Sequence, residues 1–307
     1  MKERKCVLMV SVIIPTYKSS DTLKRAIDSV LNQDYENVEI IIVDDNDPSS
    51  VDREKTELLM KEFIDNKIVK YIQHEKNMNG AAARNTGFKY SKGEYICFLD
   101  DDDIFMPDKI RIQKDYMDAH PEFSASYTWR YDSSNKIVSC SMTGDLSKEM
   151  LKLQFLPTTI TLMIRRNCYE DIGGFDPSFK RHQDIEFLLR FFEKYKIGVV
   201  EKPLSRIIGG HPNTLHGYKL EELKNQFLNR FDKKINEIDQ FSQGFKKEVY
   251  SVHYANVVRD HMTHGHPYMA LRLSLKCLIK YDVVFLKEVG IIARKSINNK
   301  RAKNNGR

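Results

Sequence analysis

The first hundred residues alternate short apolar runs with segments of helical periodicity, and this alternation constrains the fold more than any other feature. The apolar runs are continuous, as they are in strands that are buried on both faces. Strands are predicted at 7–14, 39–43, 68–73 and 95–99, and helices after Asp21, at 56–64 and at 80–92. Strands separated by helices predict an α/β fold with a mostly parallel central sheet flanked by helices.

The chain length limits the number of domains. With 307 residues, 41% of them hydrophobic, the chain can bury one large α/β domain with a small appendage. The domain is expected to span 1–218, followed by a helical region at 219–293 with a hairpin whose turn lies near Gly265. Residues 294–307 are basic and poor in apolar side chains, so a disordered tail is expected there.

Charge and cysteine content restrict the partners and the compartment. The net charge of +6 suits nucleotide phosphates, an anionic membrane surface or nucleic acid. A nucleic-acid-binding protein is the remote alternative, because the lysines are dispersed outside the tail and no nucleic-acid motif occurs. The five cysteines have no paired spacing. Together with an apolar N-terminal run too short for a signal peptide, they favour a cytoplasmic protein.

Three polar clusters follow predicted strands. These are Pro15-Thr16-Tyr17, Asp44-Asp45 and the run from Asp100 to Asp103. Because ligands of open parallel sheets bind beyond the carboxyl ends of the strands, the three clusters are expected to share one crevice. Four adjacent carboxylates repel each other, so either Mg²⁺ or Mn²⁺ neutralises the run or it is a solvated loop.

Phosphate-binding glycine motifs are missing from the sequence. It has neither a Gly-x-Gly dinucleotide fingerprint nor a Walker-type loop. A nucleotide bound beyond the strands would therefore need a metal ion and cationic side chains for its phosphates.

A set of ordered motifs at 10–215 resembles the inverting glycosyltransferases of family 2, which have a GT-A fold and often build bacterial surface polysaccharides. The motifs are Val12–Tyr17, Ser29–Gln33, Ile41–Asp45, Asn77–Gly87, Gly93–Asp103, Gly173–Asp176, His182–Asp184 and Leu188-x-Arg190. Any one of these motifs is weak, but their order and spacing together are specific.

The resemblance implies a role for each matching residue. The implied nucleotide-binding residues are Pro15, Thr16, Tyr17, Asp44, Arg84, Asp100 and Asp101, with Asp44 facing uracil. Asp102 would ligate Mg²⁺ or Mn²⁺, and Asp184 would be the catalytic base. Without the resemblance, a carboxylate at the start of a helix is the simpler interpretation of Asp184.

Several histidine and aromatic residues leave alternatives open. His211 and His216 follow the base helix and are candidates for a diphosphate or metal contact, against an ordinary surface role. His261, His264 and His266 are disfavoured as metal ligands because no carboxylate or cysteine completes the set. Trp129, Tyr127 and Tyr131 alternate as on one strand face, which is favoured over stacking on an acceptor sugar.

The function implied by these motifs is inverting transfer from a UDP-sugar to a hydroxyl of a growing glycan, with a GDP- or dTDP-sugar as the alternative donor. The acceptor would be a glycan or a lipid-linked glycan, and no nucleic acid would be bound. The apolar and basic segment 281–307 could lie on the inner face of an anionic membrane. The simpler alternative is that its apolar residues pack on the helical hairpin.

Overall fold

The computed structural model describes residues 8–179, 181–209 and 215–304, with side chains described as far as Arg294. The chain forms two compact units. The sheet unit comprises Met1–Ser147 and Phe155–Gly210, and the helical unit comprises Lys148–Gln154 and His211–Arg307. The boundary thus falls at Gly210, earlier than the expected 218. The helical unit also includes the short segment Lys148–Gln154 from the middle of the chain. Local sequence patterns could not show that this segment packs with helices that follow it much later in the sequence.

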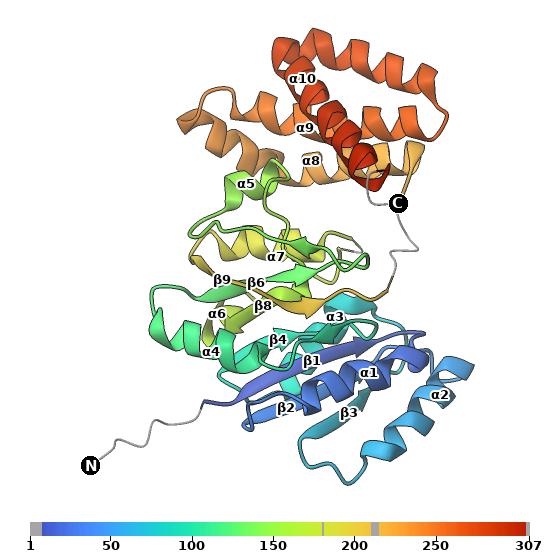
Figure 1. The fold of residues 1–307 in the computed structure, drawn as a ribbon, viewed down its shortest axis with the longest axis vertical. Helices are drawn as coiled ribbons and strands as arrows, with labels where there is room; N and C mark the ends of the chain where they lie inside the picture. Colours follow the sequence, from blue (N-terminus) through green and yellow to red (C-terminus); the bar gives the residue numbers. More distant parts are fainter. Residues whose placement is uncertain (1–7, 180, 210–214, 305–307) are drawn as a thin grey trace. The chain divides into compact units, whose positions relative to one another are not determined.

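One mixed sheet forms the centre of the sheet unit (Figure 1). Its order is β3 (Val69–Gln73), β2 (Val38–Asp44), β1 (Val10–Thr16), β4 (Tyr95–Phe98), β8 (Leu162–Arg165), β6 (Ala125–Tyr131), β9 (Ile197–Arg206) and β5 (Ile104–Phe105), with β7 (Ile137–Val138) beside β6. Strands β3, β2, β1 and β4 are parallel, as predicted. Beyond β4 the sheet is mixed: β8 pairs antiparallel with both β4 and β6, whereas β6 and β9 are parallel.

Helices alternate with strands along the chain, as expected for crossover connections between parallel strands. They are α1 (Ser20–Leu31), α2 (Val51–Met60), α3 (Asn79–Tyr90), α4 (Lys109–Ala119), α6 (Arg166–Asp171) and α7 (Gln183–Phe191), with short 3₁₀ turns at Lys61–Phe63 and Thr159–Thr161. Helix α2 begins before the predicted position because the Ser50 side chain accepts a hydrogen bond from Arg53 N and caps it. The N-cap of α1 is Ser19, not Ser20 or Asp21 as expected, and it makes no side-chain capping bond.

The strand register brings the polar clusters to one edge of the sheet. Thr16 at the end of β1 lies opposite Asp44 at the end of β2, and Asp45 N donates to Thr16 O at 2.9 Å. On the other side of β1, Leu99 N donates to Ile13 O at 3.0 Å and extends the pairing with β4. The acidic run therefore leaves the sheet beside Thr16, which confirms that the three clusters lie at the same edge.

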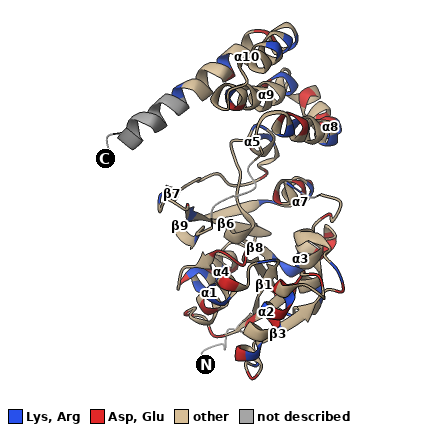
Figure 2. Ribbon diagram, turned by 90° about the vertical axis from the view of Figure 1, so that its right-hand side faces the viewer, with Lys and Arg blue, Asp and Glu red and all other residues tan. Residues whose placement is uncertain are grey.

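The helical unit contains α8 (Gly217–Phe241), α9 (Phe245–Thr263) and α10 (Pro267–Asn304). The predicted hairpin of α9 and α10 is confirmed by their close packing. Basic and acidic side chains are interspersed on α8 and α9 (Figure 2). Buried His253 stacks on Phe227 at 4.8 Å and contacts Leu151 O at 2.9 Å, which ties α9 to the short inserted segment.

The C-terminal segment differs from the expectation of a disordered tail. Helix α10 continues to Asn304, and no glycine or proline interrupts it after Gly290. Within α10, the backbone of Asp282 (φ 54°, ψ −142°) separates two helical stretches. In the part of the chain that the structure describes, no helix is both long enough and apolar enough to cross a bilayer.

The aromatic residues of β6 lie as a strand predicts. Tyr127 Oη and Trp129 Nε1 both donate to the Cys140 carbonyl, at 3.2 and 2.8 Å, so they share one face of the strand. This confirms the strand interpretation that was favoured for the alternating Tyr127, Trp129 and Tyr131.

Candidate active site

The acidic run that follows β4 is held against the end of β1. Asp101 Oδ2 accepts a hydrogen bond from Tyr17 N at 3.1 Å. Burial raises the pKa of Asp101 to about 6, and the charges of Asp100 and Asp102 add to the rise, whereas the Tyr17 N–H opposes it.

Asp103, at the other end of the run, anchors the chain beyond β9. Its Oδ1 accepts a hydrogen bond from Ile208 N at 2.9 Å. Burial and the charge of Asp100 raise the pKa of Asp103 to about 7. Two neighbouring carboxyl groups thus have raised pKa values because negative charge is concentrated and partly buried at this edge of the sheet.

Asp102 lies between them and faces the backbone of Gly209. A Cβ atom at position 209 would lie 2.1 Å from Asp102 Oδ2, so any other residue there requires the carboxylate to move. Arg25 Nη2 donates to the Asp102 carbonyl at 2.8 Å, which holds the backbone of the run against α1. Carboxylate oxygens are hard donors of the kind that Mg²⁺ and Mn²⁺ prefer, so the residues present fit a divalent cation.

Arg84 connects the acidic run to α7. Its Nη2 pairs with Asp100 Oδ1 at 2.7 Å, and its Nη1 donates to Gln183 Oε1 at 3.1 Å. The guanidinium lies over the ring of Phe175, 5.5 Å from the centroid. A cationic side chain is therefore fixed next to the carboxylates, where anionic phosphates could reach it.

Asp184 lies in the first turn of α7, next to Gln183. Its Oδ1 accepts a hydrogen bond from Ile185 N at 2.9 Å, which agrees with the helix-start interpretation. Burial raises the pKa of Asp184 and the charge of Asp100 adds to the rise, whereas the Ile185 N–H and the charge of Arg84 oppose it. A partly accessible carboxylate with a raised pKa is also a candidate general base, so the helix-start interpretation does not exclude that role.

Two motif residues for which the sequence indicated no role position this site. Asn85 Oδ1 accepts from Tyr169 Oη (2.8 Å) and Phe175 N (2.9 Å), and Asn85 Nδ2 donates to Phe175 O (2.7 Å). Arg190 forms two bonds to Glu186 and donates to Gly174 O at 2.7 Å. These bonds fix α7 and the turn before it, so that Arg84 and Asp184 keep their positions.

Asp44 differs from the sequence expectation. It is fully buried, and every partner is part of the protein. Asn46 N and Nδ2 donate to Oδ1 at 2.9 and 2.8 Å, while Tyr71 Oη at 2.5 Å and Arg53 Nε at 3.1 Å approach Oδ2. The resemblance implied that Asp44 faces uracil, but both of its carboxylate oxygens already bond to neighbouring protein groups. A residue at a strand end is exposed only when no later segment covers it.

Replacement of Asp44 by alanine should therefore destabilise the protein. The change leaves the Arg53 guanidinium, itself buried, without its carboxylate, and removing one partner of a buried ion pair costs about 3–5 kcal/mol. Urea unfolding followed by circular dichroism measures the effect. Asp47→Ala, an exposed change in the same loop, should cost less than about 0.5 kcal/mol. Equal unfolding midpoints for the two variants would contradict the structural role.

Only one of the two histidines predicted to contact a diphosphate or metal lies within the described residues. His211 lies outside the described residues. His216 belongs to the helical unit, where its Nδ1 lies 2.7 Å from Asp260 Oδ1. The objection that no carboxylate completes a histidine set is also wrong, since Asp260 lies beside His264. The four-residue spacing of Asp260 and His264 was the signal that could have revealed it.

Comparisons with known proteins agree with this geometry. The family model described as glycosyl transferase family 2 matches residues 11–180, more than half of the chain. An uncharacterised glycosyltransferase of Rickettsia felis is 34% identical over 211 residues, which cover 67% of this chain and 34% of that protein. The chain belongs to glycosyltransferase family 2. It spans about a third of the length of these first relatives.

Further similarities come from polysaccharide enzymes and solved structures. Escherichia coli WfgD, a UDP-Glc:α-D-GlcNAc-diphosphoundecaprenol β-1,3-glucosyltransferase, is 38% identical over 105 residues, covering 34% of this chain and 39% of WfgD. The crystal structure of S. aureus TarS 1–349 matches with a TM-score of 0.63 at 17% identity, over 94% of this chain and 92% of that one. The TarS likeness shows a GT-A fold, as predicted.

Proposed function

We propose that this chain transfers a sugar from a nucleotide-sugar, a UDP-sugar in the first instance, to a hydroxyl group of a growing surface glycan, with inversion at the anomeric carbon. The observation that supports it most is the hydrogen-bonded chain Asp100–Arg84–Gln183, which ends beside Asp184. It joins an acidic run, a fixed cation and a carboxyl group of raised pKa at the carboxyl edge of the parallel strands.

The nucleotide would bind over the end of β1. Pro15, Thr16 and Tyr17 line this edge, and Tyr17 is exposed enough to stack on a base. Asp100 and Asp101 would face the ribose, and Arg84 would face the phosphates. Asp44 would contribute indirectly, because its carboxylate holds Asn46 and Tyr71 in place.

Asp102 would hold the divalent ion, Mg²⁺ or Mn²⁺, at the acidic run. When bound, the ion neutralises negative charge on the departing nucleoside diphosphate. Around it, Asp101 and Asp103 keep the run in place through Tyr17 N and Ile208 N. Gly209 leaves room beside the Asp102 carboxylate, because any side chain there would occupy the same space.

Asp184 would take the proton of the attacking acceptor hydroxyl. The hydroxyl oxygen forms the new bond to the anomeric carbon on the side opposite the leaving diphosphate, and the bond to that diphosphate breaks. A single base and an opposed leaving group give inversion, so an α-linked donor sugar yields a β-linkage. Burial raises the pKa of Asp184, and the charge of Arg84 opposes that rise.

The donor assignment draws on similar proteins. WfgD is named for UDP-Glc, and a TarS structure matching at a TM-score of 0.59 was solved with UDP-GlcNAc. The mannosyltransferase PcManGT, with a TM-score of 0.55, was solved with GDP-Man and Mn²⁺, so a GDP-sugar is the alternative.

A panel of UDP-, GDP- and dTDP-sugars with Mn²⁺ tests the donor. We expect UDP-sugars to raise the melting temperature by several degrees at saturation, because binding to the folded state alone adds about 2.7 kcal/mol at a hundredfold excess over Kd. Nucleotide-sugar hydrolysis should follow the same order. A larger shift with GDP-sugars would select the alternative donor, and no shift with any of them would contradict the proposal.

The acceptor is a glycan or a lipid-linked glycan. The name of WfgD includes a diphosphoundecaprenol-linked sugar, which supports a lipid-linked acceptor at a membrane surface. In the segment proposed to contact an anionic membrane, Val283 and Leu286 are exposed, but Phe285 and Ile292 are buried in the helical unit. Membrane contact would therefore involve only one face of this part of α10.

A further inference from the structure

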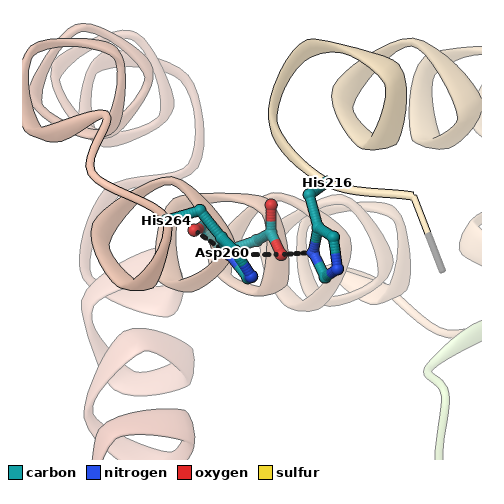
Figure 3. Close-up of side chains that lie close together, drawn as sticks. All are labelled: His216, Asp260 and His264. Carbon is teal, nitrogen blue, oxygen red and sulfur yellow. Dashed lines mark hydrogen bonds and ion pairs between the residues drawn. The ribbon is translucent and has the colours of Figure 1, made fainter.

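Two histidines and one aspartate converge at one end of the helical unit (Figure 3). His216 immediately precedes α8, Asp260 lies in the last turn of α9, and His264 follows that turn. One ligand atom from each residue can be chosen so that all three lie within 4.8 Å of one another. The three residues come from the start of α8 and the end of α9.

Asp260 Oδ1 is the centre of the cluster. It lies 2.7 Å from His216 Nδ1 and 3.1 Å from His264 Nδ1, and the two imidazole centroids are 3.9 Å apart. The other oxygen, Oδ2, accepts a hydrogen bond from Gly217 N at 2.7 Å. Burial opposes ionisation of Asp260, but the His216 and Gly217 bonds outweigh it and hold the pKa of this carboxyl below its usual value. The group is therefore an anionic ligand that is already oriented.

These distances are close to those of a metal site. Ligand atoms about 2.0–2.2 Å from one ion, at angles between 90° and 110°, lie about 3.0–3.5 Å apart. The two distances to Asp260 Oδ1, 2.7 and 3.1 Å, need an opening of only a few tenths of an ångström, and the ligand atoms of the two histidines lie within 4.8 Å of each other. His264 Nδ1 also lies 3.0 Å from Asp260 O and 3.1 Å from Thr263 Oγ1, and it would exchange these contacts for the ion.

Solvent access is compatible with such a site. The side chains of His216 and His264 are 44% and 41% exposed, whereas Asp260 is 9% exposed. The buried carboxylate would fix the ion, and water could complete its coordination from the open side. Two imidazoles and one carboxylate with open positions form a donor set for divalent transition metals and not for Mg²⁺.

We propose that His216, Asp260 and His264 form a second metal site, for a divalent transition-metal ion of the Zn²⁺ class, that joins the start of α8 to the end of α9. It is distinct from the Mg²⁺ or Mn²⁺ site proposed at Asp102, which belongs to the sheet unit. The bound ion would take the place of the contacts between the two Nδ1 atoms and Asp260 Oδ1, and it would fix the start of α8 to the end of α9.

Titration of tag-free, full-length protein with Co²⁺ and Zn²⁺ tests the site. The Asp102→Ala background removes the other proposed ion. We expect one equivalent to bind, a visible Co²⁺ absorption band that Zn²⁺ abolishes, and a melting temperature that Zn²⁺ raises. His264→Gln and His216→Gln should each weaken binding at least tenfold and remove the rise in melting temperature.

His120→Gln is the matched control. His120 is similarly exposed and also contacts a carboxylate, Glu122 at 3.0 Å, but the pair lies in the sheet unit. The His120→Gln variant should leave the affinity for Zn²⁺ unchanged. Circular dichroism at matched concentration shows whether each variant keeps its helices, and Asp260→Asn serves if a histidine variant does not fold. Binding that is equal in wild type and His264→Gln, or lost equally in His120→Gln, would overturn the proposal.

Discussion

Asp184→Asn should lower kcat by about 10²–10⁴-fold while the Kd for the nucleotide-sugar stays within about twofold of wild type. Asparagine keeps the shape of the side chain and can still accept from Ile185 N, but it cannot take the acceptor proton. Steady-state transfer assays and donor titration, performed on the same preparation, measure the two quantities. Loss of donor affinity together with kcat would mean that Asp184 holds the nucleotide and is not the base.

Glu170→Gln, an exposed carboxylate on α6, is the matched control for this change and should leave kcat unaltered. The pH profile adds a second readout. A base must be ionised, so kcat should fall as the pH drops through the pKa of Asp184, which burial raises above the usual value for an aspartate. The acid limb of the wild-type profile should therefore lie at a higher pH than an unperturbed aspartate would give, and it should be absent from the residual rate of the asparagine variant.

Asp102→Ala should abolish metal-dependent transfer, with a loss of at least about a thousandfold in kcat/KM. The variant should also bind UDP more weakly than wild type when Mn²⁺ is present and equally well when EDTA removes the ion. The difference between the two titrations isolates the contribution of the metal, because a general distortion of the nucleotide site would weaken UDP binding in both. Unchanged Mn²⁺-dependent turnover would refute the assignment.

Asp115→Ala provides the comparison for the loss of one negative charge, since Asp115 is exposed on α4. The Mn²⁺ dependence of Asp115→Ala should match that of wild type.

Gly209→Ala tests the same site through the residue that faces Asp102. The added Cβ would lie 2.1 Å from Asp102 Oδ2, so the carboxylate must move and activity should fall. Wild-type activity in Gly209→Ala would mean that the loop after β9 can move without affecting the site.

Some of the site could be predicted from the sequence because it depends on local order along the chain. The acidic run follows β4 and Thr16 ends β1, so the parallel pairing of β1 with β4 brings them together. The tyrosine and tryptophan of β6 were likewise placed by their alternation alone. In each case a repeat of two residues or a strand end was sufficient, since these features do not depend on distant segments.

Contacts between distant residues could not be predicted in this way. Arg84 meets Gln183 99 residues further along the chain, and His216 meets Asp260 at a separation of 44. Asp44 was predicted to face uracil, but Tyr71 and Arg53 contact its carboxylate. Whether a polar side chain at a strand end is available to a ligand depends on which segments cover it.

The sequence by itself determined the alternation of strands and helices, the edge of the sheet where the polar clusters lie, and the family of the chain. These follow from periodicity and from motifs whose spacing along the backbone is fixed. Only the tertiary structure decided that Asp44 is a buried anchor, that Arg84 bridges Asp100 and Gln183, and that Asp260 joins two histidines. The physical reason is that hydrogen-bond partners and burial depend on distances between segments that only packing brings together.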